Sequence, residues 1–152
     1  MEEKYIGEFK NGVYEGQGIL NFFNGEIYNG GWKDGLMHGN GLYSYPDGSE
    51  LFGAFENGIK INGKLKYANG DLFTGEFKDG LKHNGVLKYS DGREFRGDFK
   101  NGMRKCGTMK FVNGDVYDGE YDNNGLISGS GKMIYANGDI YSGDFLHGLM
   151  HG

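Results

Sequence analysis

The sequence predicts an all-β fold, an elongated single-layer antiparallel meander of serial β-hairpins. Three observations support this prediction. A glycine preceded by Asn or Asp recurs along the whole chain, aromatic and glycine residues alternate between these pairs, and no stretch has the periodicity of a helix. Glycine also makes up 31 of the 152 residues, against a usual share of about 7%. We therefore expect one twisted sheet of about 13 short strands.

The recurring Asn-Gly and Asp-Gly pairs predict the turns of these hairpins. Such pairs are the strongest short-range hairpin signal, because a type I′ turn requires positive φ at both central residues. Steps of 10 or 11 residues alternate with steps of 12 or 13. The pairs are Asn11-Gly12, Asn24-Gly25, Asp34-Gly35, Asp47-Gly48, Asn57-Gly58, Asn69-Gly70, Asp79-Gly80, Asp91-Gly92, Asn101-Gly102, Asn113-Gly114, Asn124-Gly125 and Asn137-Gly138.

The first strand of each repeat has the pattern aromatic-x-Gly-x-aromatic. Successive copies begin 22 to 24 residues apart, a period typical of stacked repeat architectures. One copy has a leucine in place of its first ring. The copies start at Tyr5, Tyr28, Leu51, Phe73, Phe95, Tyr117 and Tyr141.

The second strand of each repeat has the pattern Gly-x-Gly-x-apolar-x-aromatic. Gly16-x-Gly18-x-Leu20-x-Phe22 is the first copy. The three repeats of 22 residues, which start at 51, 73 and 95, are one residue shorter here and keep a single glycine of the pair. These repeats therefore depart from the pattern in the middle of the chain.

Strand alternation assigns the rings and glycines to one face of the sheet. A glycine beside an aromatic residue on the neighbouring strand lets the ring lie flat over the backbone, which covers this face without a second layer. The opposite face is mostly polar, and we expect its acids and lysines to form cross-strand ion pairs. These residues are Glu8, Glu76, Asp98, Glu120, Asp144, Lys66, Lys88 and Lys110.

The pattern resembles the MORN repeat, whose core is Tyr-x-Gly-x-x-x-x-Gly-x-x-x-Gly-x-Gly. Tyr5, Gly7, Gly12, Gly16 and Gly18 match it in the first repeat. The resemblance covers residues 1–152 as a single array of six full repeats and the start of a seventh. It implies a scaffold or adaptor role in cytoskeletal, ciliary or flagellar, or membrane-junction assemblies.

Composition limits the other classes of function. The net charge of −5 argues against nucleic-acid binding. Cys106 is the sole cysteine, and the charged N-terminus has no signal peptide or lipidation motif, which favours a cytoplasmic protein. Cys106 itself occupies a glycine position of the repeat, where a small residue is tolerated.

We expect the function to be non-catalytic partner binding, through an aromatic groove that receives a helix or an extended segment of another protein. Addition of a partner strand to an edge of the sheet is a related mode of partner binding. Exposed apolar stripes usually mark interaction sites, although rings that stack on glycines can also close their own core. The candidate groove residues are rings from the middle of the array, namely Tyr45, Tyr67, Phe77, Tyr89, Phe99 and Phe111.

An alternative is peripheral attachment to anionic phospholipids. Residues 78–110 contain nine basic side chains against four acidic ones, and such an excess attracts anionic lipid or an acidic partner. The candidate patch is Arg93, Arg96, Arg104 and Lys105. The acidic N-terminal half opposes this alternative.

Catalysis has no support in the sequence, so we expect no enzyme activity, cofactor or metal. The histidines, His151 among them, occupy repeat positions far apart along the array, whereas a metal site needs three or four converging ligands. The segment Gly58–Lys64 resembles a P-loop, but Leu65 replaces the Ser or Thr that would hold Mg²⁺. The chain could instead be the repeat segment of a larger enzyme.

The C-terminal sequence suggests a further mode of association. The seventh repeat stops at Gly148–Gly152, where its second strand should begin. Tyr141–Leu146 would then be an open edge strand, which is a template for self-association or for a partner strand.

Overall fold

The computed structural model describes residues 3–146 and the backbone of 149–151. Gly148, Gly152 and the side chain of His151 lie outside the described residues. The chain divides into two compact units, Met1–Gly80 and Leu81–Gly152, which we call the N-terminal and the C-terminal unit. Within the described ranges, no helix is long and apolar enough to cross a membrane.

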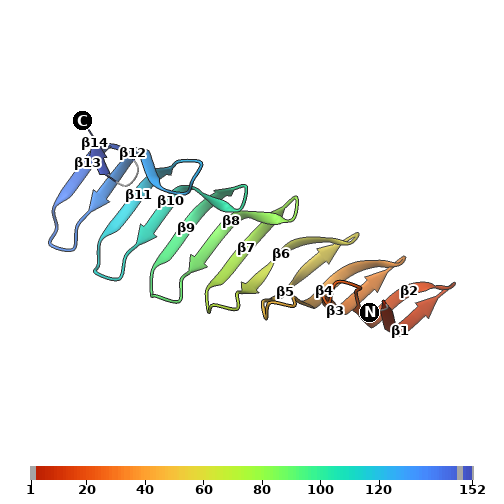
Figure 1. Ribbon diagram of the computed structural model, residues 1–152. Coiled ribbons are helices and arrows are strands. Elements are labelled where there is room, and N and C mark those ends of the chain that lie inside the picture. The colour runs from red at the N-terminus through yellow and green to blue at the C-terminus, as the bar shows by residue number, and fades with distance from the viewer. Residues whose placement is uncertain (1–2, 147–148, 152) are drawn as a thin grey trace. The chain divides into compact units, whose positions relative to one another are not determined.

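The N-terminal unit is an antiparallel meander in which each strand pairs with the next along the chain. Figure 1 shows these hairpins from red to yellow-green. The predicted fold class is confirmed, since no other kind of regular element occurs among the described residues. The strands are β1 (Lys4–Lys10), β2 (Val13–Asn21), β3 (Ile27–Lys33), β4 (Leu36–Ser44), β5 (Glu50–Glu56), β6 (Ile59–Lys66) and β7 (Leu72–Lys78).

The C-terminal unit has the same organisation, shown from green to blue in Figure 1. Its strands are β8 (Leu81–Lys88), β9 (Glu94–Lys100), β10 (Met103–Lys110), β11 (Val116–Tyr121), β12 (Ile127–Ile134), β13 (Ile140–Leu146) and β14 (Leu149–His151).

The expectation of an open edge at Tyr141–Leu146 is wrong for the second half of that strand. Strand β14 pairs with β13 through Asp144, Phe145 and Leu146. Residues 149–151 therefore belong to the second strand of the seventh repeat, and the described part of the chain has one strand more than the sequence predicted.

The Asn-Gly and Asp-Gly pairs form two kinds of turn, not one. Five pairs are two-residue turns with positive φ at both residues, as at Asn57 (φ 51) and Gly58 (φ 82). The other seven have positive φ at the glycine alone and close three-residue loops. In the loop at Asn69, the Tyr67 amide donates to the Asp71 carbonyl and the Gly70 amide donates to the Tyr67 carbonyl.

The Asn or Asp of a three-residue loop has a different role from the one predicted. In six of the seven loops its side-chain oxygen accepts a hydrogen bond from the amide two residues later, as from Asp71 to Asn69 at 2.9 Å. In the loop at Asn124 the acceptor is instead Asp122. Asp and Asn are favoured in such loops because their short side chains bond the local backbone. The type I′ explanation therefore holds for the five two-residue turns only.

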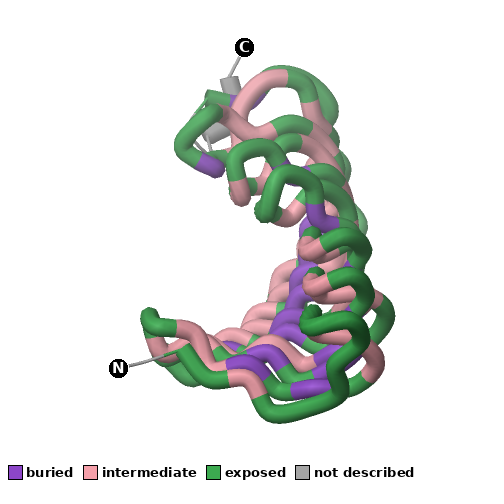
Figure 2. Tube along the Cα trace, turned by 90° about the vertical axis from the view of Figure 1, so that its right-hand side faces the viewer, coloured by how far each residue is buried: buried purple, intermediate pink, exposed green. Residues whose placement is uncertain are grey.

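Most of the core consists of aromatic side chains, which lie on glycines as predicted, and leucine and methionine make up the rest. Tyr28, Phe73, Phe95 and Tyr117 are fully buried. A Cβ on Gly41 would overlap the Tyr28 ring, so the glycine on the neighbouring strand is required for this packing. Most buried residues lie within the strands and the turns are largely exposed, a distribution that Figure 2 shows along the chain.

Bulges in the second strands explain why three of the repeats have 22 residues rather than 23. Three residues, 15 to 17, lie opposite Glu8 on the neighbouring strand, and Gly16 has a φ of +70°. In the 22-residue repeat that starts at 51, Ile61 alone is the extra residue between the pairs Ala54–Asn62 and Phe55–Lys60. The length difference therefore lies in the bulge and leaves the strand register intact.

Among the described residues, the cross-strand ion pairs expected on the polar face form at one place only. Lys88 approaches Glu94 at 4.0 Å. Glu8 and Glu120 instead accept hydrogen bonds from backbone amides of the bulges, those of Gln17 and Ser130. A bulge leaves backbone donors without ladder partners, and a carboxylate satisfies them.

Candidate partner-binding pocket

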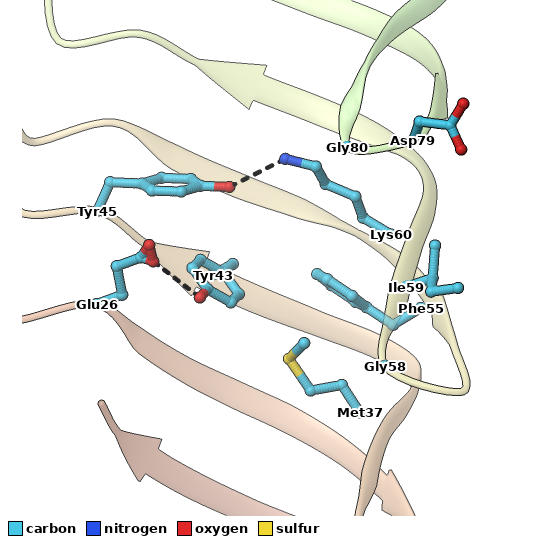
Figure 3. Close-up of a pocket in the computed structure, with 10 residues that line it drawn as sticks. All are labelled: Glu26, Met37, Tyr43, Tyr45, Phe55, Gly58, Ile59, Lys60, Asp79 and Gly80. Carbon is cyan, nitrogen blue, oxygen red and sulfur yellow. Dashed lines mark hydrogen bonds between the residues drawn. The ribbon is translucent and has the colours of Figure 1, made fainter. Parts of the chain in front are cut away.

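A cavity of about 450 Å³ opens on the aromatic face of the N-terminal unit. Its lining residues come from β4, β5 and β6, from the loops before β3 (Glu26) and after β4 (Tyr45), and from the turns at Gly58 and at Asp79-Gly80 (Figure 3). A cavity of this size falls within the range of sites that hold small molecules or side chains of a partner. It is lined by Glu26, Met37, Tyr43, Tyr45, Phe55, Gly58, Ile59, Lys60, Asp79 and Gly80.

The cavity lies where the repeat pattern changes. Tyr43 stands at a second-strand position where the other repeats have leucine or methionine, and its cross-strand partner is Leu51, which replaces the first ring of the third repeat. In the other repeats the second strand carries the aliphatic residue and the next strand carries the ring. Here the second strand carries the ring, Tyr43, and the next strand carries the aliphatic residue, Leu51. The Tyr43 ring lies 5.0 Å from Tyr45 and 6.3 Å from Phe55, between ring centroids.

Two polar contacts fix the side chains of the pocket. The Tyr43 hydroxyl donates to Oε2 of Glu26 at 2.9 Å, and Nζ of Lys60 donates to the Tyr45 hydroxyl at 3.4 Å. Both contacts are drawn in Figure 3. Nζ of Lys60 also lies 5.1 Å from the centroid of the Phe77 ring, within the range of a cation–π interaction.

Burial shifts the acid–base properties of these groups. It lowers the pKa of Lys60, an effect that the negative charge of Glu26 opposes. It raises the pKa of Tyr45 to about 12, and burial followed by the hydrogen bond to Glu26 raises that of Tyr43. Both phenols are therefore protonated at neutral pH and can donate or accept hydrogen bonds.

The six predicted groove residues fall into two groups. Phe77 and Phe99 are buried parts of the core, with 8% and 5% of their surface exposed. The other four are partly buried and start three-residue loops, namely Tyr45, Tyr67, Tyr89 and Phe111. Of the six, Tyr45 lines the cavity.

The predicted basic patch is divided between two sides of the C-terminal unit. Arg93 and Arg104 both approach the Tyr89 ring, with Cζ 4.3 Å and 5.8 Å from its centroid. Arg96 is exposed and alternates with the buried Phe95, so it points to the opposite face. Lys105 and Arg104 border the same small hollow.

Sequence reasoning missed Glu26, Tyr43 and Lys60 as pocket residues. A signal for Tyr43 was present, because it is the one ring among the aliphatic residues at its repeat position. Lys60 has counterparts in Lys82 and Arg104, and each of these cations lies over a ring of the following repeat. The repeat alignment could have shown this row of cations on the aromatic face.

The fold and the pocket define a protein built from serial β-hairpins with an aromatic, partly charged face. The family model described as "MORN repeat" matches residues 5–27, 28–50, 73–92, 117–140 and 141–152. The chain belongs to the MORN-repeat family. The segments between these matches, 51–72 and 93–116, form the same hairpins.

Solved structures with a similar fold are distant in sequence. The TCP domain of Sas-4 (dCPAP) from Drosophila melanogaster, in complex with a proline-rich motif of Ana2 (dSTIL), is 14% identical with a TM-score of 0.50, over 83% of this chain and 70% of that one. The TCP10c domain of D. melanogaster Sas-4 is 14% identical with a TM-score of 0.46, over 83% and 76%. No curated protein matches the sequence.

Proposed function

We propose that the protein is a non-catalytic scaffold that holds an extended segment of a partner protein in the cavity between Glu26 and Lys60. The observation that carries the proposal is this cavity of about 450 Å³, which is lined by aromatic side chains and lies where the repeat pattern changes. Aromatic-lined grooves with a few polar groups are typical of sites that bind extended, proline-rich or apolar segments.

The polar groups of the cavity suit recognition. Glu26 accepts from Tyr43 and Lys60 rests on the rings of Tyr45 and Phe77. Both charges are therefore held in place and remain next to the open cavity, where they can orient a partner segment.

The Sas-4 domain, which shares the fold, is in complex with a proline-rich motif of Ana2. A single-layer sheet of that kind can therefore hold a segment of another protein. This supports an extended segment over a helix as the ligand of the cavity. A cytoskeletal or ciliary setting forms part of the same proposal, and fluorescence localisation of the tagged protein tests it.

Selection from a random peptide library on the full chain tests the proposal. We expect enriched peptides whose binding, measured by fluorescence anisotropy, weakens about tenfold with Tyr43→Leu and Tyr45→Ser together, because one lost hydrogen bond and the lost ring contacts amount to about 1.4 kcal/mol or more. Tyr43→Leu restores the residue type of the other repeats, so the fold should persist.

Tyr135→Ser is the matched control, because Tyr135 starts an equivalent loop in the C-terminal unit. It should leave the affinity unchanged. Peptides that bind the wild type and the Tyr43/Tyr45 variant equally would contradict the proposal, as would a selection that enriches no sequence.

A further inference from the structure

The C-terminal unit has a second, smaller cavity, which the proposed function does not use. Its volume is about 40 Å³, and we call it the basic hollow. Three of its side chains are cationic and one is acidic. The acid, Asp122, accepts hydrogen bonds from the backbone amides of Asn124 and Leu126. The hollow is lined by Lys100, Asn101, Met103, Arg104, Lys105, Tyr121, Asp122 and Asn123.

Arg104 is held in place without a carboxylate partner. Its guanidinium lies over the Tyr121 ring, with Cζ 4.9 Å from the centroid, and Nη2 donates to the Gly125 carbonyl at 2.9 Å. Arg93, by contrast, pairs with Asp91 at 2.8 Å. Among the described residues, no carboxylate lies within ion-pair distance of Arg104. A guanidinium has five donors, so most of those of Arg104 are left for another acceptor.

Tyr121 presents a hydroxyl that the fold does not require. The hydroxyl is buried and has no hydrogen-bond partner. The same repeat position holds phenylalanine or tryptophan in every other copy, namely Phe9, Trp32, Phe55, Phe77, Phe99 and Phe145. A phenylalanine would therefore fill the site without a polar atom to satisfy. Burial raises the pKa of Tyr121, which keeps the phenol protonated and able to donate.

We propose that the basic hollow binds a carboxylate side chain of an acidic, extended peptide, with Arg104 and Tyr121 as the hydrogen-bond donors. A planar guanidinium matches a carboxylate in size and geometry. The hollow has room for one small group, since a water molecule occupies about 30 Å³ of the liquid. Arg93 and Tyr89 lie next to Arg104 on the same face and extend the site, where they would contact further residues of the same peptide.

A peptide fits these observations better than a membrane surface. Arg104 is partly buried and the Tyr121 hydroxyl is buried in a small hollow, where a flat bilayer does not reach. The remaining arginine of the sequence patch, Arg96, points to the opposite face, so the arginines do not form one basic surface. The net charge of the whole chain is −5, which further opposes adsorption to an anionic membrane.

Fluorescence anisotropy with two labelled octapeptides tests this inference on the full chain. One peptide alternates Glu and Pro, and the other alternates Gln and Pro. We expect the Glu peptide to bind and the Gln peptide to bind at least tenfold more weakly. Arg104→Met should weaken the Glu peptide about tenfold and Tyr121→Phe several-fold, because each removes a hydrogen bond to a charged group.

Arg96→Met is the matched control, since it removes the same charge from the opposite face of the unit. It should change the affinity less than twofold. An equal loss with Arg96→Met would overturn the inference in favour of diffuse charge attraction, and an unchanged affinity with Tyr121→Phe would also overturn it. Phosphatidylserine vesicles that bind the chain through Arg104 and displace the peptide would assign the hollow to lipid instead.

This site is independent of the cavity in the N-terminal unit. Tyr43→Leu with Tyr45→Ser should leave binding of the Glu peptide unchanged. Tyr121→Phe places the residue type of the other repeats at 121 and should retain the wild-type thermal unfolding midpoint, so a loss of binding there would not be a loss of fold.

Discussion

The Tyr43 hydroxyl donates a 2.9 Å hydrogen bond to the Glu26 carboxylate, and this bond exists because a tyrosine replaces the aliphatic residue of the other repeats. Glu26→Ala leaves a partly buried hydroxyl without its acceptor, so we expect a loss of about 1–3 kcal/mol in the free energy of unfolding. In a Tyr43→Leu background the same change should have little effect. Urea denaturation of the wild type, the two single variants and the double variant measures the coupling energy between Glu26 and Tyr43. Losses of stability that simply add in the double variant would contradict the prediction.

Gly41→Ala should destabilise the protein through the Tyr28 ring. The new Cβ would overlap ring atoms of a fully buried side chain, and overpacking of this kind typically costs about 1–3 kcal/mol. Chemical denaturation measures the effect. In a Tyr28→Leu background the cost of Gly41→Ala should fall by more than half, because the obstacle is gone. If Gly41→Ala costs as much stability in the Tyr28→Leu background as in the wild type, the backbone and not the Tyr28 ring requires the glycine.

The two kinds of turn predict opposite responses to the same substitution. Asn57→Gly should be neutral or slightly stabilising, because residue 57 has a φ of 51° and glycine adopts positive φ without steric penalty. Asn69→Gly should lower stability by about 0.5–1.5 kcal/mol, because it removes the acceptor for the Asp71 amide. Thermal unfolding compares the two variants, and equal effects would contradict this distinction.

Stability should fall at alkaline pH as buried tyrosines ionise. Burial raises the pKa of Tyr28 and of Tyr117 to about 12 each, whereas an exposed tyrosine titrates near 10. The stabilisation is therefore fully present below pH ~10 and is lost as the pH rises toward ~12. Urea denaturation at pH 8, 10 and 11.5 checks this. The double variant Tyr28→Phe/Tyr117→Phe should lose less stability over that range than the wild type.

The thiol of Cys106 should react slowly with alkylating reagents near neutral pH. Burial, followed by the charge and hydrogen bond of Asp98, raises the pKa of this thiol, and the thiolate is the reactive form. Asp98→Asn should accelerate the reaction with iodoacetamide at pH 7.5. If Cys106 of the wild type reacted faster than a free cysteine in a peptide, its thiol pKa would not be raised and the prediction would be contradicted.

The sequence was sufficient for the fold because one pattern repeats seven times. Each Asn-Gly or Asp-Gly pair gives a turn, and each alternation of ring and glycine gives a strand with a defined face. The pattern does not distinguish a turn that needs positive φ at Asn57 from one that needs the side-chain oxygen of Asn69. Both requirements select the same two residue types.

The candidate pocket was harder to predict, because it depends on departures from the pattern rather than on the pattern. Tyr45 could be chosen from its place in the row of rings, but Phe77 and Phe99 belong to the closed core. Glu26 and Lys60 lie 34 residues apart in the sequence. The fold brings them to one cavity across intervening strands, which no local motif indicates.

The bulges and loops also determine how such a chain can change in length. Residues are gained or lost at Gly16 or around Asp122–Leu126, where they alter no ladder pair. A deletion within the ladder would turn every later side chain of that strand to the wrong face. At the level of the gene, gain or loss of a single codon should therefore be tolerated at these few points, and a longer array should form by addition of whole hairpins.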